Sequence, residues 1–314
     1  MIPGPLAGCH ARPFRGEHAC SGALGAKRAK PPEALPCAVH IVLQMRPQAP
    51  LSKAYRLPAA SATLDGMSRE PIPPPSLLQL RTPPRRCSYL PDETASLEYR
   101  FHHHLTASQL EALLVRGWRR HGQHIFRPAC PACDSCRSLR VDVERFSPTK
   151  SQRRALKRNA DVEVVLQPAT VSEEHLRLYN AWHADMHVRR GWPQQSMTME
   201  EYDEAFLSGR GDYACELLYR REGKAIGVGL VDLTPNACSS VYFYHDPQWR
   251  SQAPGTYSVL QEIELCRARR LRHLYMGYWI ADCPSMAYKN RFGPHEILQE
   301  YCMDTGRPEW RPVN

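Results

Sequence analysis

Residues 213–279 contain an order of elements that few folds can accommodate. The segments YACELLY (213–219) and KAIGVGLVDLT (224–234) flank the turn RREG, a pattern that predicts an antiparallel hairpin. SSVYFYHD (239–246) predicts a third strand beside it. An amphipathic helix over 256–270 then leads to another strand, HLYMGYW (273–279). Antiparallel strands, one crossover helix and a further strand predict an α+β fold.

The preceding part of the chain alternates strand and helix signals. Leu139, Val141 and Val143 alternate in SLRVDV, and VEVVL (162–166) reads as another strand, with a short basic helix over 147–159 between them. Three capping boxes predict helix starts: Thr106-x-x-Gln109, Thr170-x-x-Glu173 and Thr198-x-x-Glu201. We therefore expect a Cys-rich α/β domain over 67–165 and a second, α+β domain over 166–314.

Residues 1–66 differ from the rest. Fifteen of the 28 prolines precede Cys87, and this segment shows neither helical nor strand periodicity. Such a stretch buries too little apolar surface to offset its ordering entropy. We expect a disordered extension or a start codon assigned upstream of Met67; an Arg-rich transit peptide is the alternative.

Composition excludes several classes of protein. Hydrophobic residues make up 42% and charged residues 23%, a globular mixture, and no apolar run reaches the roughly 18 residues of a membrane span. The net charge is +9, and five of these charges lie in residues 1–66, which hold eight Lys and Arg against three acidic residues. The remaining chain is mildly basic, which is compatible with a local nucleic-acid-binding patch. We expect no membrane partner and a cytoplasmic location.

Cys130, Cys133 and Cys136 form a C-x-x-C-x-x-C cluster. Two-residue gaps allow successive sulfurs to turn toward one centre, and a tetrahedral soft-metal site needs a fourth ligand. Cys87 is the natural candidate because it is the only other cysteine between 67 and 165. Buried free thiols are the alternative, and the spacing does not separate zinc from an iron–sulfur cluster.

The helix expected over 147–159 is unusually basic. Five cations fall within nine residues without acidic i,i+4 partners, so their repulsion is not relieved within the helix. A solvated helix face is the ordinary interpretation, whereas a phosphate backbone would neutralise such a stripe. The candidate residues for binding a nucleic-acid backbone are Lys150, Arg153, Arg154, Lys157 and Arg158.

The last two strands supply most candidate substrate-binding residues. Tyr242 and Tyr244 share a face of one strand, and we expect Tyr275, Tyr278 and Trp279 to line one cleft with them and to stack a terminal adenine. The alternative is that these aromatic side chains simply pack in the hydrophobic core, as most rows of aromatic residues do. Gly255 precedes the helix start, where an anion can bind.

The sequence resembles two groups of proteins. The strand and helix order is that of a GNAT-type acyltransferase, but the loop DPQWRSQAPGT keeps Gly255 and lacks the second glycine of the coenzyme A motif. YFYHDP, YMGYWI, MAYKNRFGP and SQRRALKRN together resemble the arginyl-tRNA–protein transferases, in the bacterial branch that transfers leucine. Departures from the family pattern include His245, Gly293, Leu90 and the Pro-containing SQAPGT loop.

The resemblance, which extends over residues 80–298, implies leucyl transfer from tRNA to proteins beginning with Asp or Glu, marking them for degradation. It implies an aminoacyl-tRNA co-substrate, no nucleotide cofactor, and a metal cluster at the cysteines. Lys289 and Arg291, with Tyr288, are the candidates for holding the acceptor carboxylate. Tyr244, Asp246 and Tyr278 are the candidate catalytic residues. Arginine as the donor, an acetyl-CoA-dependent GNAT enzyme and a non-catalytic RNA-binding protein remain alternatives.

Overall fold

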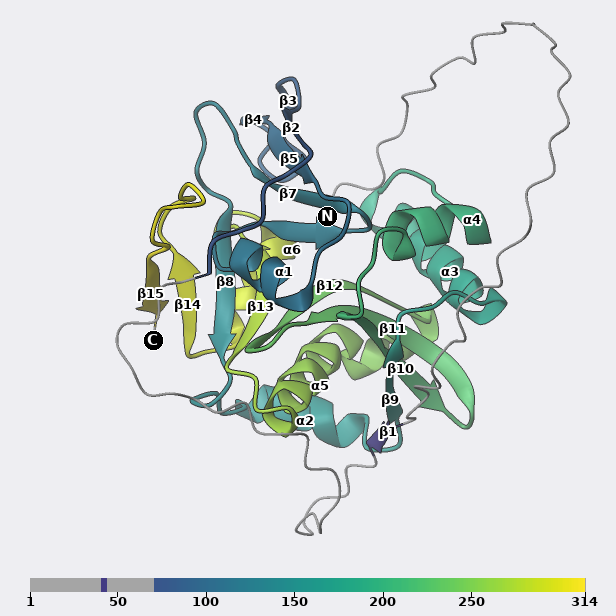
Figure 1. Ribbon diagram of the computed structural model, residues 1–314. Helices are drawn as coiled ribbons and strands as arrows, with labels where there is room; N and C mark the ends of the chain where they lie inside the picture. Colours follow the sequence, from purple (N-terminus) through teal and green to yellow (C-terminus); the bar gives the residue numbers. More distant parts are fainter. Residues whose placement is uncertain (1–40, 44–70, 314) are drawn as a thin grey trace, which may run out of the picture.

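The computed structural model describes residues 41–43 and 71–313. A nine-stranded sheet forms its centre, in the order β1-β9-β10-β11-β12-β13-β8-β14-β15 (Figure 1). All neighbouring strands are antiparallel except β12 and β13. Along the chain these strands are β1 (Ile41–Leu43), β8 (Arg137–Asp142), β9 (Glu163–Pro168), β10 (Ala214–Arg221), β11 (Lys224–Leu233), β12 (Ala237–His245), β13 (His273–Trp279), β14 (His295–Leu298) and β15 (Trp310–Val313).

The predicted hairpin, third strand, helix and last strand are all present. Strands β10, β11 and β12 are consecutive and antiparallel, and helix α5 (Pro254–Ala268) crosses over to β13, which pairs in parallel with β12. The turn between β10 and β11 is shorter than expected: Glu222 (φ 50°) and Gly223 (φ 77°) form a two-residue loop. Positive φ at both central residues suits the right-handed twist of a hairpin.

Helices cover both faces of the large sheet. Helix α2 (Lys150–Arg158) and α5 lie together on one face, and α1 (Ala107–Leu114), α3 (Glu173–Arg190), α4 (Met199–Tyr202) and the π-helix η1 (Asp203–Leu207) lie on the other (Figure 1). Neighbouring residues of one strand serve the two cores: Leu217 packs toward α5, whereas Leu218 packs toward α3. Successive side chains of a strand point to opposite faces of the sheet, so this strand is buried on both faces.

A four-stranded sheet stands on the α1 side of the large sheet. Its order is β2-β5-β7-β6, built from β2 (Leu78–Arg81), β5 (Leu97–Phe101), β7 (His124–Pro128) and β6 (Arg119–His121), with a short pair, β3 (Arg85–Arg86) and β4 (Thr94–Ala95), beside it. A buried ion pair joins the sheets, since Arg120 donates to the Asp232 carboxylate on β11 at 2.8–3.1 Å.

The predicted Cys-rich domain does not coincide with the small sheet. Strand β8 lies between β13 and β14 of the large sheet, and the predicted boundary at residue 165 falls inside β9. Residues 1–66 lie outside the described residues apart from β1, which pairs with β9. The sequence had indicated no strand there.

Two of the three predicted capping boxes are confirmed, at Thr106 and at Thr198. The third is wrong: the N-cap of helix α3 is Ser172, which lies after Thr170 in the chain and accepts from the His175 N–H. Thr170 is engaged elsewhere, its backbone N–H donating to Glu216 Oε2 at 3.2 Å. The buried Glu216 carboxylate on β10 therefore competes for the backbone that the sequence pattern assigns to the helix.

Candidate functional site

The strand ends of β12 and β13 diverge. Their parallel pairing covers only Ala237–Ser239 against His273–Tyr275, and β13 is then bulged at Tyr275/Gly277 where it pairs with β8. Gly277 has φ 79°, and a Cβ there would lie 3.5 Å from the guanidinium of Arg119. The buried Arg119 side chain enters this gap from β6 and donates to the carbonyl oxygens of Ser240 and, at 3.5 Å, Tyr275.

A buried carboxylate lies beneath that gap. Glu262 on α5 is 1% exposed, and its Oε1 accepts from the Ser240 hydroxyl at 3.2 Å. Burial raises the pKa of Glu262 to about 8, although the hydroxyls of Ser240 and Ser258 and the Arg119 guanidinium all act to lower it. Burial similarly lowers the pKa of Lys289 to about 7, assisted by Arg119. Arg119, Glu262 and Lys289 were not recognised together from the sequence because they come from three distant segments.

Tyr242 and Tyr244 share a face as predicted, but their partners differ from those expected. The Tyr244 hydroxyl lies 2.7 Å from the Tyr202 hydroxyl, and the Tyr242 hydroxyl lies 3.0 Å from His183 Nε2. The rings around them come from α3, α4 and η1. Burial lowers the pKa of His183 to about 4, so its imidazole is neutral at pH 7.

The other aromatic candidates are occupied by contacts within the chain. The Tyr278 hydroxyl donates to the carbonyl oxygens of Gly117 and Phe126, both at 3.0 Å. Tyr275 accepts from Arg140 at 3.1 Å, and the half-buried Trp279 donates to the Ala287 carbonyl at 3.3 Å. The structure thus places Tyr275 against Arg140 on β8 and leaves Trp279 nearer the surface.

The loop before α5 is a 3-10 helix, η2 (Pro247–Gln252). Asp246 caps it, since its side chain accepts from the Gln248 N–H at 2.9 Å. Ala253 then adopts φ 59° and Pro254 occupies the first turn of α5, where its missing N–H costs no hydrogen bond. No atom lies within 4 Å of the Cβ position at Gly255, so this helix start is open.

Residues 284–291 separate the three acceptor-binding candidates. They form α6 (Pro284–Ala287) and the 3-10 helix η3 (Tyr288–Arg291). Lys289 is buried, and its Nζ donates to the Tyr278 carbonyl at 2.6 Å. Arg291 is exposed and Tyr288 is 39% exposed. Arg291 is therefore the cation of this segment that an incoming carboxylate can reach directly.

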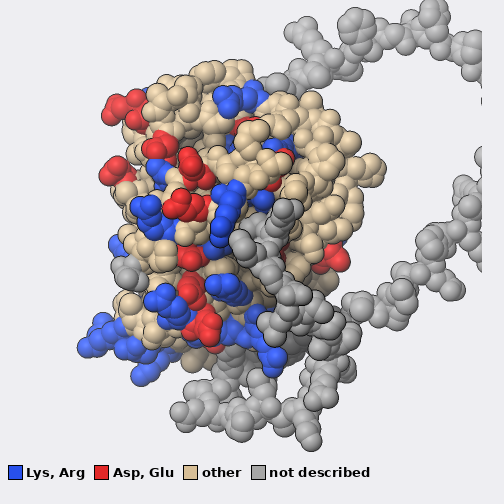
Figure 2. All heavy atoms as spheres, turned by 60° about the vertical axis from the view of Figure 1, so that its left-hand side comes forward, with Lys and Arg blue, Asp and Glu red and all other residues tan. Residues whose placement is uncertain are grey.

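Helix α2 confirms the predicted basic helix, and Thr149 caps it through a capping box with Gln152. All five predicted cations are exposed, and none forms an ion pair with the acidic residues of the described chain. The helix is fixed to the candidate site by two side chains: Gln152 Nε2 donates to the Arg291 carbonyl at 3.0 Å, and Asn159 Nδ2 donates to the Gln252 carbonyl at 2.9 Å. In Figure 2, Lys and Arg side chains alone project at the lower left edge, whereas both signs alternate above.

The four predicted metal ligands lie near one another. Burial raises the pKa of the Cys136 thiol to about 12, and Cys130, Cys87 and Cys133 raise it further, which places all three within electrostatic range. All four side chains are half-buried free thiols. Across the described residues, however, no three His, Cys, Asp or Glu side chains are arranged as metal ligands.

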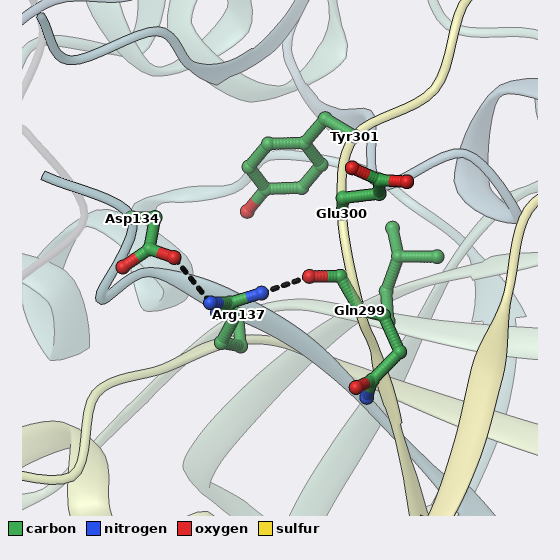
Figure 3. A pocket seen from close by; sticks show the side chains of 6 residues that line it. Asp134, Arg137, Gln299, Glu300 and Tyr301 are labelled. Atoms are coloured by element: carbon green, nitrogen blue, oxygen red, sulfur yellow. Dashed lines mark hydrogen bonds and ion pairs between the residues drawn. The ribbon is translucent and has the colours of Figure 1, made fainter.

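A cavity of about 350 Å³ adjoins the cysteine segment and is lined by Asp134, Arg137, Leu298, Gln299, Glu300 and Tyr301 (Figure 3). The Arg137 guanidinium already contacts the Asp134 carboxylate and the Gln299 carbonyl. Tyr301 donates to the Cys136 carbonyl. These contacts use the one cation of the cavity, which makes it a poor site for a substrate carboxylate.

Family comparisons cover most of the described chain. The model for the N terminus of arginine-tRNA-protein transferase matches residues 85–154, and the model for its C terminus matches residues 174–299. An "Aspartate/glutamate leucyltransferase" from Helicobacter hepaticus is 33% identical over 238 residues, covering 76% of this chain and 99% of the relative. The chain belongs to the arginine-tRNA-protein transferase family. It is therefore a transferase enzyme, as the resemblance implied.

A second relative is similarly close in sequence, whereas the solved structures are distant. The "Aspartate/glutamate leucyltransferase" of Halorhodospira halophila is 37% identical over 228 residues, which cover 70% of this chain and 93% of the relative. Among solved structures, L-PGS from Bacillus licheniformis is 12% identical, with a TM-score of 0.36 over 52% of this chain and 47% of that one. Among the described residues, no helix has the length and apolar character needed to cross a bilayer.

Proposed function

We propose that this member of the transferase family transfers leucine from leucyl-tRNA to the α-amino group of proteins that begin with Asp or Glu. The observation that carries the proposal is the identity of 33–37% to leucyltransferases over more than nine-tenths of their length. A leading leucine would then act as a degradation signal. Because leucyl-tRNA is the donor, we place the reaction in the cytoplasm.

The chemistry requires positioning more than activation. The aminoacyl ester of tRNA is already activated, so no ATP or other nucleotide cofactor is needed. Holding the amine near the ester carbonyl supplies several kcal/mol of the barrier reduction, by an order-of-magnitude estimate. A GNAT-like arrangement of β10–β12, α5 and β13 provides the scaffold, and we assign the terminal adenosine to the open start of α5 at Gly255. The proposed catalytic residues are Tyr244, Asp246 and Tyr278, and Tyr275 is proposed to bind substrate.

Helix α2 is proposed to bind the tRNA backbone. Its five exposed cations have no acidic partner in the described chain, so phosphates can neutralise them. The test is a triple substitution, Arg153→Ala, Arg154→Ala and Lys157→Ala, with tRNA affinity measured between 50 and about 200 mM salt. We expect weaker binding and a shallower salt dependence. An unchanged slope would assign the stripe to an ordinary solvated face.

Arg291 and Lys289 are proposed to select the acidic acceptor, with Tyr288 beside them. Their locations assign different tasks: Arg291 is exposed and can meet a carboxylate, whereas the buried Lys289 positions the chain by donating to the Tyr278 carbonyl. Arg291→Ala should therefore depress transfer to Asp- and Glu-peptides by orders of magnitude and leave tRNA binding unchanged. Equal discrimination between Asp- and Asn-peptides in wild type and variant would place the pocket elsewhere.

An iron–sulfur cluster or zinc is proposed for Cys87, Cys130, Cys133 and Cys136. The support is the set of four thiols, three of which act on the Cys136 thiol. Their side chains would have to turn to reach ligand geometry, since no described group is arranged for a metal. Such a centre would tie the cysteine segment to the 87–90 loop. It takes no part in the transfer step proposed here.

One assay separates the candidate functions. Purified protein is incubated with labelled leucyl-tRNA, arginyl-tRNA or acetyl-CoA, each with Asp-, Glu- and Asn-initiated peptides. We expect transfer from leucyl-tRNA to the Asp- and Glu-peptides alone. Transfer from arginyl-tRNA would change the donor, acetylation would indicate a GNAT acetyltransferase, and tRNA binding without any transfer would leave an RNA-binding protein.

A further inference from the structure

Glu262 is a buried carboxylate that lacks the partners a structural carboxylate usually has. Its Oε1 accepts from the Ser240 hydroxyl at 3.2 Å and the Ser258 hydroxyl also acts on the carboxylate, but no cation of the described chain forms an ion pair with it. Arg119 lies within electrostatic range but forms no ion pair with it; the Arg119 guanidinium is turned to the carbonyl oxygens of Ser240 and Tyr275. A carboxylate buried without an ion-pair partner is costly to ionise, and strongly perturbed carboxylates of this kind cluster at functional sites.

The position of Glu262 is as informative as its burial. It faces the gap between the diverging ends of β12 and β13, the same gap that Gly277 keeps wide enough for Arg119. The gap is lined by carbonyl oxygens, a hydroxyl, a guanidinium and the carboxylate. The buried carboxylates on the strands of this sheet have partners: Asp232 pairs with Arg120, and Glu216 Oε1 lies 3.0 Å from His175 Nε2.

Each element packed against Glu262 contributes a polar or titratable group. These are Arg119 from β6, Cys238 and Ser240 from β12, Tyr219 from β10, Ser258 from α5 itself and Tyr288 from η3. Tyr288 is the most exposed of them, with 39% of its surface accessible, and Ser240 is half-buried. A substrate that displaces the Tyr288 ring would therefore approach Glu262 from the acceptor-binding segment 288–291.

We propose that Glu262 is the catalytic proton acceptor of the transfer reaction, and that the reaction occurs in the gap between β12 and β13. This inference rests on the proposed function. The α-amine nitrogen attacks the leucyl ester carbonyl, a C–N bond forms, and the C–O bond to the terminal ribose breaks. The ribose oxygen leaves as a hydroxyl, and the one proton released when an α-ammonium becomes an amide passes to the Glu262 carboxylate.

The acid–base properties of the two groups match. A free α-amine has a pKa near 7.7–8.0, and burial raises the pKa of Glu262 to about 8. Proton transfer between groups of nearly equal pKa has little free-energy cost, which is the condition for efficient general base catalysis near neutral pH. A glutamate of ordinary pKa would be a much weaker acceptor for this proton.

The experiment compares Glu262→Gln with Glu264→Gln. Both variants make the same change on α5, but Glu264 lies at the surface and pairs with Arg267. Single-turnover transfer from leucyl-tRNA to an Asp-peptide, tRNA affinity and the urea unfolding midpoint are measured at about pH 8, where part of the acceptor is still an α-ammonium and part of Glu262 is ionised. We expect Glu262→Gln to lose at least about 100-fold in transfer rate, with unchanged tRNA affinity and an equal or higher midpoint. Glu264→Gln should match wild type in all three.

A structural role predicts a different combination of results. If Glu262 only supports packing, Glu262→Gln will lower the midpoint, and its rate per folded molecule will stay within about threefold of wild type. A transfer rate of Glu262→Gln within about threefold of wild type overturns the proposal, whatever the unfolding midpoint. Glu262→Asp is a second variant: it keeps a carboxylate one methylene further back and should retain more activity than Glu262→Gln. A wild-type protein that transfers no leucine would instead refute the proposed function.

Discussion

Tyr278→Phe tests whether this tyrosine is catalytic or structural. The hydroxyl is buried and shares its proton between the carbonyl oxygens of Gly117 and Phe126, both 3.0 Å away. Those residues belong to the turn after α1 and to β7, so the hydroxyl joins the small sheet to β13. Phenylalanine keeps the ring and removes this donor. Leaving buried carbonyl groups without a donor costs about 1–3 kcal/mol.

The expected result is a loss of stability with little loss of catalysis. At a typical urea dependence the unfolding midpoint should fall by about 0.5–1 M, and kcat per folded molecule should stay within about threefold. Tyr288→Phe is the stability control, because Tyr288 is 39% exposed and should lose less than about 0.5 kcal/mol. A loss of 100-fold or more in kcat at an unchanged midpoint would refute the structural interpretation and establish Tyr278 as catalytic.

Three further outcomes follow from the buried charges and thiols. Asp232→Asn strips the buried Arg120 of its charge partner and should cost about 3–5 kcal/mol in urea unfolding; a cost below about 1 kcal/mol would contradict this. Burial holds the pKa of Lys289 at about 7, below its unfolded value of 10.5, so the unfolded state binds more protons between these pH values and stability rises with pH there. Lys289→Met should remove that rise, as measured by Tm from pH 7 to 9.5. Cys133→Ser should lower bound metal and stability together, and fully active wild-type protein with under about a third of an equivalent of metal would argue against the site.

Local patterns predicted much of the fold. Alternation and turn residues located β10, β11, β12 and β13, and the basic run over 147–159 located α2. These signals depend on neighbours in the chain, so the sequence contains them. Thr170 shows the limit: its local pattern matched a cap, but Glu216, 46 residues away, binds its N–H. Ser172 then caps α3 instead.

The candidate site was predicted less well because it is made of long-range contacts. The type of residue at Lys289 suggested a surface cation, yet the fold buries it against the Tyr278 carbonyl. Tyr242 was expected to face the 275–279 strand, whereas α3 supplies its partner, His183. Arg119 and Glu262 carried no signal, since neither belongs to a motif and the contact of Arg119 with Ser240 spans 121 residues of sequence.

Gln152 shows how a local signal gains a long-range consequence. Its Oε1 accepts from the Thr149 N–H at 2.8 Å and so completes the cap of α2, while its Nε2 donates to the Arg291 carbonyl at 3.0 Å. One amide therefore fixes both the start of the cationic helix and the segment that we assign to the acceptor. Because tRNA phosphates on α2 would be held at a set distance from 288–291, the ester at the tRNA end and the acceptor amine can be brought together by rigid parts of the protein. Positioning of this kind is what an already activated ester needs.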